Sequence, residues 1–380
     1  MSDNPVSEEG SGATGAQGGG PLDPQALRLL WLMLPETRSF RELYWLSQMK
    51  DAAVTAVASE PTDDPVTFVQ RPYKRPTRRF VEAGALAWFE DLDSIPGPFD
   101  WVGGLELCAL VTRQASEQAT RRGAKHFAIT WGNNARNPLY YVPPYRQALK
   151  VVKENVQLVI CTIDAARDHC VDLGIPEERC AVVYPPLPTD LFHPPAKPVE
   201  EPIAIFISPL ASNKGIDRVL EAFDIVRRRM PEARLRVIGG GPMEDLVRRR
   251  AKETGGAVEL LGRMDRHGVA EQLRQASVFV TAPRPTPVWD EQFGLAYVEA
   301  MATGLPVVTT ECGTSYEAVS APNLRVEDKA DALAEALMTF LGDPGLRARI
   351  APHNRAEMVR RYAFDQQIAK LRAAFAGAPD

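Results

Sequence analysis

Short apolar runs alternate with amphipathic stretches along most of this chain, and this alternation constrains the fold more than any other feature. In the first half, six apolar runs occupy 27–34, 52–59, 99–104, 126–131, 156–161 and 180–185. Runs that are continuously apolar indicate strands covered on both faces, as in a parallel sheet. Helix-like segments at 106–123 and 144–155 separate several of them, which predicts right-handed crossovers in a doubly wound α/β domain.

The same alternation begins again after a proline-dense segment, 186–202, which is the best linker candidate in the chain. We therefore predict two doubly wound, parallel-sheet, Rossmann-like α/β domains that face each other across a cleft. Ligands of such sheets bind outside the carboxyl ends of the strands, so the cleft is the expected site. The predicted division is a disordered tail (1–20), an N-terminal α/β domain (21–195), a C-terminal α/β domain (196–360) and a terminal helix (361–380) that packs back on the N-terminal domain.

Composition excludes several classes of partner. Lys and Arg total 44 against 49 Asp and Glu, a formal charge of -5, whereas a nucleic-acid partner requires a basic surface. No run approaches the roughly 18 apolar residues of a membrane span. The N-terminus lacks a secretion signal, and the scattered cysteines form no CxxC pair, so we expect a cytoplasmic protein without disulfides, a zinc site or a cofactor.

The most specific segment runs from Asp290 to Pro306 and carries two glutamates, Glu291 and Glu299. Glu291 falls in a loop just before a predicted helix, whose first N–H groups favour an anion or sugar hydroxyls. Glu299 lies two turns further on, inside the apolar run FGLAYVEAM, where an idle charge would be costly. The alternative is a capped helix with solvent-facing glutamates.

This segment resembles the signature of the family-four retaining glycosyltransferases, which have the GT-B fold. The resemblance runs from about 126 to 375 and is strongest from 203 to 320. Other elements agree with the family in order and spacing: Lys214-Gly215, the turn Gly239-Gly240-Gly241-Pro242, Gly262, Gly313 with Glu317, and the hinge-like segment 182–194.

The resemblance implies that the domain 21–195 is the acceptor side and that the domain 196–360 binds the nucleotide sugar. It also implies roles for individual residues. Lys214 would neutralise the donor diphosphate, Glu291 would hold hydroxyls of the transferred sugar, and Glu299 would bind the ribose. The remaining donor-binding residues would be Gly239, Gly240, Gly241, Gly262, Arg263, Phe293, Gly294 and Leu295. Candidate sugar or acceptor contacts are Trp131, Asn133 and Asn134, and no metal ion is expected.

The chain departs from the family pattern in three places. Ser208-Pro209-Leu210 stands where an arginine partner of Lys214 is usual, which leaves Arg284 or Arg263 as substitutes. The first strand is followed by 35–40 (PETRSF) rather than by a glycine-rich loop. Trp131-Gly132-Asn133-Asn134 replaces the usual histidine, and an asparagine can hydrogen-bond a sugar but cannot act as a general base.

The reaction that the resemblance implies is transfer of a sugar from a UDP- or GDP-linked donor to a small-molecule or glycan acceptor, with retained anomeric configuration and without a metal ion. Two other functions stay open at this point. One is a non-catalytic nucleotide-sugar-binding protein of the same fold, because of the three departures. The other is a nucleotide-cofactor oxidoreductase, which rests only on the triple glycine.

Overall fold

The computed structural model describes residues 26–34, 41–60, 66–74, 83–134, 137–287 and 289–378. The predicted tail, 1–20, and the loop 35–40 lie outside the described residues. The chain forms two compact units, one built from 1–129 and 143–157 and the other from 130–142 and 158–379. Within the described residues, no helix combines the length and the apolar character that crossing a bilayer requires.

The first sheet has the strand order β3-β2-β1-β6-β7-β8-β9. Its strands are β1 (Leu27–Leu32), β2 (Ala52–Ala58), β3 (Thr67–Gln70), β6 (Trp101–Leu105), β7 (Lys125–Thr130), β8 (Val156–Cys161) and β9 (Cys180–Val182). Every pairing for which the register is known is parallel, as the continuous apolar runs predict. A separate antiparallel pair is made by β4 (Tyr73–Lys74) and β5 (Trp88–Phe89).

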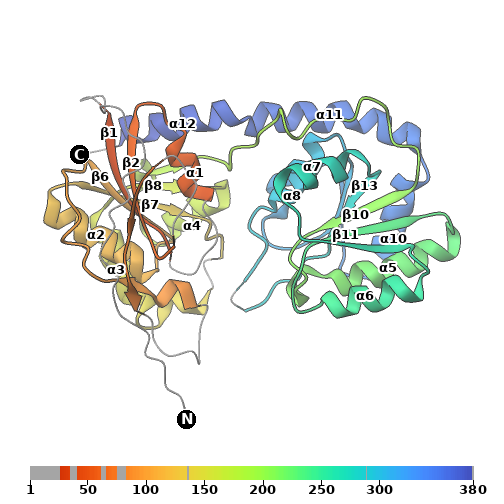
Figure 1. The fold of residues 1–380 in the computed structure, drawn as a ribbon, viewed down its shortest axis with the longest axis horizontal. Helices are drawn as coiled ribbons and strands as arrows, with labels where there is room; N and C mark the ends of the chain where they lie inside the picture. The colour runs from red at the N-terminus through yellow and green to blue at the C-terminus, as the bar shows by residue number, and fades with distance from the viewer. Residues whose placement is uncertain are drawn as a thin grey trace, which may run out of the picture. The chain divides into compact units, whose positions relative to one another are not determined.

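Helices cover this sheet as the crossover prediction requires (Figure 1). They are α1 (Arg41–Ser47), α2 (Leu110–Arg122), α3 (Tyr145–Asn155) and α4 (Asp164–Asp172), with short 3-10 turns at Ala83–Leu86, Pro138–Tyr141 and Glu177–Arg179. Helix α2 packs on β6 and on α3, and α1 packs on β2. The core between α2 and the sheet contains Leu30, Val102, Val111 and Ala115, all fully buried.

The second sheet has the order β12-β11-β10-β13-β14-β15, and all of its pairings are parallel. The strands are β10 (Ile203–Ile207), β11 (Arg234–Ile238), β12 (Val258–Gly262), β13 (Val278–Val280), β14 (Val307–Thr310) and β15 (Leu324–Val326). The strand order reverses between β10 and β13, so the carboxyl ends of these two strands mark the usual ligand position of a doubly wound sheet.

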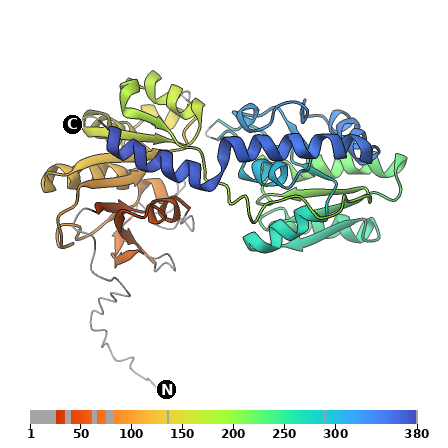
Figure 2. The same ribbon diagram turned by 90° about the horizontal axis from the view of Figure 1, so that it is seen from above.

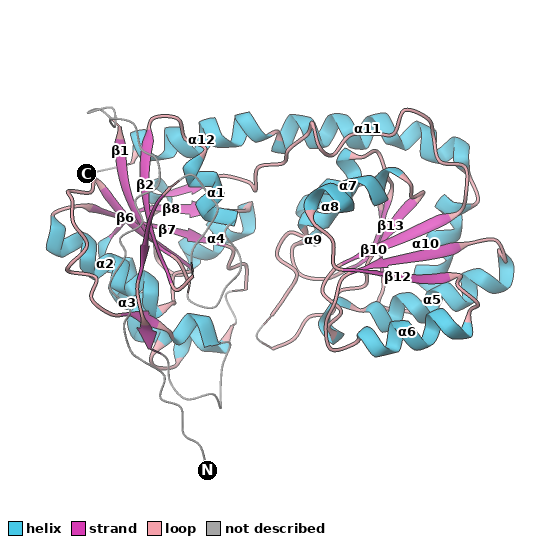
Figure 3. Ribbon diagram, viewed as in Figure 1, coloured by secondary structure: helices cyan, strands magenta, loops and turns pink. Residues whose placement is uncertain are grey.

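Helices lie on both faces of the second sheet (Figure 3). They are α5 (Ile216–Arg229), α6 (Glu244–Glu253), α7 (Arg266–Arg274), α8 (Leu295–Ala302), α9 (Ser315–Ala318), α10 (Ala330–Leu341) and α11 (Pro344–Tyr362), with a 3-10 turn at Ser212–Lys214. Helix α10 packs on α5, and α11 packs on α8. Apolar side chains of α5 and α10, among them Phe223 and Phe340, are buried against Phe206 and Val237 of the sheet.

The C-terminal helical region is interrupted at Ala363, where α11 ends and α12 (Phe364–Gly377) begins (Figure 2). Ala363 has an extended backbone and forms a parallel bridge with Leu187, while the Leu187 amide donates to the Tyr362 carbonyl. On α12, the Gln367 side chain accepts a hydrogen bond from the Tyr184 amide at 3.0 Å. The hinge-like segment 182–194 is therefore held by both terminal helices.

Candidate functional site

Lys214 and Glu291, the two residues predicted to act on the donor, form an ion pair. Lys214 ends the 3-10 turn after β10, and Glu291 lies in the loop before α8. The Lys214 Nζ lies 3.0 Å from the Glu291 Oε2, and the two side chains are 21% and 11% exposed. The pair thus keeps a positive and a negative group ready, in a partly dehydrated setting that strengthens their interaction with a ligand.

Trp289 completes this group, and it was not predicted from the sequence. The Lys214 Nζ lies 4.1 Å from the centre of the Trp289 ring, a cation–π contact. The ring therefore fixes the ammonium from a second side, next to its carboxylate partner. A signal was present in the sequence, because a large aromatic residue in the polar, proline-rich loop 283–290 has no strand or helix to pack into.

Lys214 is placed by the tight turn that follows it. Gly215 has φ +71°, a conformation that favours glycine, and it is the N-cap residue of α5. A Cβ added at this position would lie 1.7 Å from the carbonyl oxygen of Ala282, which follows β13. The turn that carries Lys214 therefore packs directly on the backbone leading to Trp289 and Glu291.

We expect Gly215→Ala to lower the free energy of unfolding by about 1–3 kcal/mol more than Gly255→Ala does, because the added methyl group overpacks the Ala282 contact. Gly255 is a matched control, since its φ is +60° and a Cβ there would meet nothing within 4 Å. Urea unfolding of both variants measures the difference. Equal losses would show that only the backbone conformation, and not the close approach, requires glycine at 215.

The backbone of Glu291 is held by residues that follow β7 and β14. The Glu291 carbonyl accepts hydrogen bonds from the Thr314 amide at 2.9 Å and from the Asn133 side chain at 3.1 Å. Asn133 also donates to the Thr314 hydroxyl at 2.9 Å. Gly313 is required here, because a Cβ would lie 2.2 Å from the Glu291 carbonyl oxygen. This packing fixes the loop from which the Glu291 carboxylate projects.

Asn133 therefore comes together with the predicted donor residues, although through the Glu291 backbone. Trp131 and Asn134 come from the same segment, are half-buried, and lie one and four residues beyond the end of β7. Glu317 has a different role from those of the other acidic residues. It accepts hydrogen bonds from the amides of Asp164 and Ala165 and caps α4, and burial raises the pKa of its carboxyl.

Helix α8 begins directly after the Glu291 loop. Gly294, with φ +74°, precedes the first helical residue, Leu295, and Phe293 is 1% exposed. The Tyr297 hydroxyl hydrogen-bonds with Thr281 and Thr309, and burial raises the pKa of that hydroxyl. These contacts anchor α8 to the strands that carry the site.

Glu299 lies on α8 with only 13% of its side chain exposed, and the Arg266 Nε at the start of α7 is 3.8 Å from its Oε1. The Glu299 carboxylate is therefore not an unpaired charge inside an apolar run, because it has a cationic neighbour. The solvent-facing alternative for Glu299 is contradicted by this burial.

The glycine-rich turn after β11 packs against the segment that follows β10. A Cβ at Gly239 would lie 2.0 Å from the Ser208 carbonyl oxygen, and one at Gly241 would lie 2.7 Å from that of Leu210. The Leu210 amide donates to the Gly240 carbonyl at 3.2 Å. At least two of these glycines are thus needed for contact between two loops. Gly262 has φ +75°, and a Cβ added there would meet nothing within 4 Å.

The two arginines proposed to replace the missing basic contact lie in different surroundings. Arg284 pairs with Asp217 at 3.0 Å and with Asp328 at 3.1 Å, so its charge is already neutralised. Arg263 is exposed, and its Nε would lie 2.8 Å from a Cβ at Gly240. Arg263 is therefore the better placed of the two to meet an anion beside the glycine-rich turn.

Parts of the chain are similar in sequence to known glycosyltransferases. Residues 189–357 match the family model described as glycosyl transferases group 1. A GDP-mannose-dependent monoacylated alpha-(1-6)-phosphatidylinositol monomannoside mannosyltransferase of Corynebacterium glutamicum is 31% identical over 168 residues, 43% of this chain and 44% of that protein. A GDP-mannose-dependent alpha-(1-6)-phosphatidylinositol monomannoside mannosyltransferase of Mycolicibacterium smegmatis is 26% identical over 73% of this chain and 76% of that protein.

The alignments with the relatives of higher identity are partial: this chain spans about half the length of those curated proteins, 44% and 54%. Solved structures match over nearly the whole chain. Anabaena HepE in complex with UDP has a TM-score of 0.70 at 16% identity, covering 92% of this chain and 100% of that one. Sucrose-phosphate synthase from Thermosynechococcus elongatus has a TM-score of 0.64 at 17% identity, covering 93% and 100%. The predicted GT-B fold with two Rossmann-like domains is confirmed.

Proposed function

We propose that this chain is a family-four, retaining, metal-independent glycosyltransferase that takes its sugar from a nucleotide diphosphate donor. The observation that carries the proposal is the Lys214–Glu291 ion pair beside Trp289, at the carboxyl ends of strands in the region that matches glycosyl transferases group 1. An ammonium held there suits a diphosphate, and the neighbouring carboxylate suits sugar hydroxyls.

In the proposed reaction, the bond between the sugar and the diphosphate breaks while the acceptor oxygen bonds to the same carbon. Lys214 stabilises the negative charge that develops on the leaving diphosphate, which takes the acceptor proton. Glu291 orients the transferred sugar, and Glu299 binds the ribose. Asn133 acts on Glu291 through its backbone, so it is a positioning residue and not a base.

Among the donors left open by the sequence, we propose GDP-mannose. The support is that several relatives at 26–31% identity are named GDP-mannose-dependent, whereas the UDP-bound structures that match are 15–16% identical. The acceptor is a small molecule or a glycan. Inositol-containing compounds are the first to test, because phosphatidylinositol and inositol phosphate occur in the names of these and other relatives.

The proposal is tested with purified protein, GDP-mannose and an acceptor panel in the presence of EDTA. Product mass identifies the transfer, and NMR of the new anomeric centre tests retention. Transfer with retained configuration in EDTA supports every part of the proposal. Loss of turnover in EDTA overturns metal independence, and an inverted product overturns retention. Donor binding without turnover for any acceptor would indicate a non-catalytic binding protein instead.

A separate prediction concerns the choice of donor. We expect GDP-mannose to raise the unfolding midpoint more than UDP-glucose or UDP-GlcNAc at equal concentration, because a ligand stabilises the folded state by about 2.7 kcal/mol at one hundred times its Kd. GMP and free mannose serve as controls that lack the diphosphate. A larger shift with either UDP-sugar would reverse the donor assignment and leave the glycosyltransferase proposal standing.

A further inference from the structure

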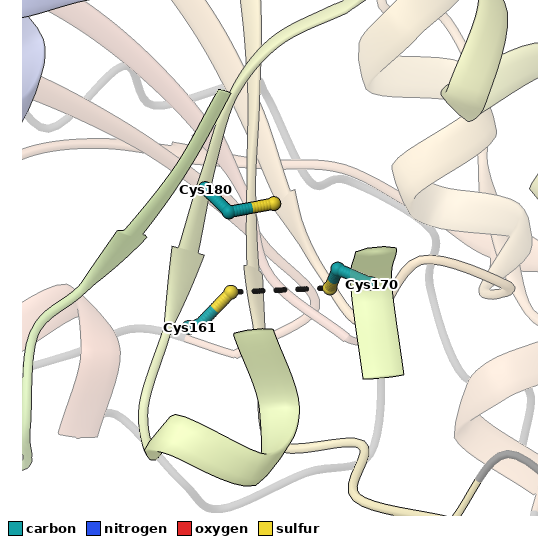
Figure 4. Close-up of side chains that lie close together, drawn as sticks. All are labelled: Cys161, Cys170 and Cys180. Atoms are coloured by element: carbon teal, nitrogen blue, oxygen red, sulfur yellow. Dashed lines mark hydrogen bonds between the residues drawn. The ribbon is translucent and has the colours of Figure 1, made fainter. Parts of the chain in front are cut away.

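Three cysteines from two neighbouring strands and the helix between them come together outside the donor site. Cys161 ends β8, Cys170 lies on α4, and Cys180 begins β9 (Figure 4). Their sulfur atoms all lie within 4.8 Å of one another, and the Cys161 and Cys170 sulfurs are 3.8 Å apart. No short sequence motif predicts this cluster, because its members are separated by nine and ten positions.

The fold explains why the three side chains converge. In the β8–β9 pairing, Cys161 lies opposite Val182 and Cys180 lies opposite Val159, so the two cysteines are diagonal neighbours on one face. Helix α4 packs against β9 and brings Cys170 to that face. The Cys161 and Cys170 side chains are fully buried, whereas Cys180 is half-buried. The cluster therefore has a rigid base and one accessible side.

The geometry points to a binding site for one thiophilic d10 metal ion, with Zn²⁺ as the representative, held by the thiolates of Cys161, Cys170 and Cys180. Zinc–sulfur bonds of about 2.3 Å place two sulfurs of one tetrahedral ion roughly 3.8 Å apart. The Cys161–Cys170 separation already has this value, and the other separations need to close by no more than about 1 Å. Water can fill the fourth position from the side of Cys180.

Two features of the surroundings suit this proposal over simple packing of small apolar thiols. The three sulfurs lie within 4.8 Å of one another, and three thiolates are a ligand set that selects Zn²⁺ or Cu⁺ over harder ions. Each thiol that binds gives its proton to solvent, so binding requires no oxidant or reductant.

The site is separate from the proposed transfer reaction. The ion would join β8, α4 and β9, and α4 is also the helix that Glu317 caps at its first residues. The expected consequence is greater stability of this region and not participation in catalysis. A metal-independent transfer reaction and a structural metal ion are compatible for this reason.

The test uses the full chain, reduced and freed of metal. In competition with a chromophoric chelator, we expect one Zn²⁺ to bind per chain, and we expect this Zn²⁺ to raise the unfolding midpoint. Cd²⁺ should give a sulfur-to-metal charge-transfer band. Loss of an outer partner of a metal site typically costs about 10–100-fold in affinity. Loss of a ligand in Cys161→Ser, Cys170→Ser or Cys180→Ser should cost at least as much. Cys108→Ser, which lies outside the cluster, is the matched control.

Unfolding of each metal-free variant shows whether the substitution itself disturbs the fold. Cys180→Ser is the decisive variant if the buried positions do not tolerate serine, because Cys180 is the most accessible of the three. Unchanged Zn²⁺ affinity in a folded Cys180→Ser protein would overturn the proposal. A reduced wild-type chain that takes up no metal would also overturn the proposal. This holds even if the same chain forms a Cys161–Cys170 disulfide when it is oxidised.

Discussion

Lys214→Ala is expected to reduce kcat about 10²–10³-fold with the proposed donor, the typical cost of removing one preorganised charge contact from such a site. The reason is that Lys214 is the basic residue held between Glu291 and Trp289, within reach of a diphosphate at this position. Arg284, one of the two arginines considered as substitutes for the usual basic contact, is already paired with two aspartates. Steady-state kinetics of the variant with GDP-mannose measure the loss.

One further variant separates the charge of Lys214 from its packing, and a second variant is a control at an exposed lysine. Lys214→Met keeps an unbranched side chain against Trp289 and should lose as much activity as the alanine variant. Lys252→Ala removes an exposed lysine of α6 and should leave activity unchanged. The Lys214→Ala variant should also unfold within a few degrees of the wild-type midpoint, because the Lys214 side chain is only partly buried. Turnover near the wild-type rate in Lys214→Ala would remove this residue from the reaction.

The sequence was most informative where a continuous apolar run met a clear boundary. The apolar run predicted as a strand at 156–161 has the bounds of β8 in the structure. Short and half-exposed edge strands were not predicted, namely β3 (TFVQ) and β15 (LRV), because their side chains do not form a buried run. Helix α4 was missed for a related reason: it buries only Ala166, His169 and Cys170 in an otherwise polar segment.

At the candidate site, the sequence identified the ionic groups but not what holds them. Lys214 and Glu291 were predicted from the motifs around them, and the structure brings them to 3.0 Å. Trp289 and Thr314 were not predicted, because their contacts depend on how separate loops meet in three dimensions. The cysteine cluster is a similar case, since a β-strand register and a helix position create it.

The triple glycine shows that a sequence motif can have more than one physical cause. The resemblance implies that these glycines bind the donor. In the structure, Gly239 and Gly241 are also required by the carbonyl groups of Ser208 and Leu210. The segment Ser208-Pro209-Leu210, which lacks the usual arginine, therefore takes part in loop packing. No such backbone contact requires glycine at two other predicted donor-binding positions. A Cβ at Gly240 would meet the Arg263 side chain, and a Cβ at Gly262 would meet nothing within 4 Å.

Glu291→Ala is expected to reduce kcat by about 10²-fold or more, because it removes both the proposed sugar contact and the partner of Lys214. Its backbone contacts with Thr314 and Asn133 use the carbonyl group, so the loop should stay in place. Kinetics together with the unfolding midpoint test both parts of this expectation. Glu311→Ala, at an exposed position after β14, is the matched control.

Glu291→Gln distinguishes the two contributions. Glutamine has nearly the same shape and can hydrogen-bond sugar hydroxyls, but it carries no charge to balance Lys214. If hydroxyl binding is the main role, this variant should recover much of the activity that alanine loses. If the charge is needed, because it positions the ammonium or stabilises a positive sugar in the transition state, glutamine should be nearly as slow as alanine with little change in KM. Wild-type turnover in Glu291→Ala would contradict both roles, because the carboxylate 3.0 Å from Lys214 would then take no part in the reaction.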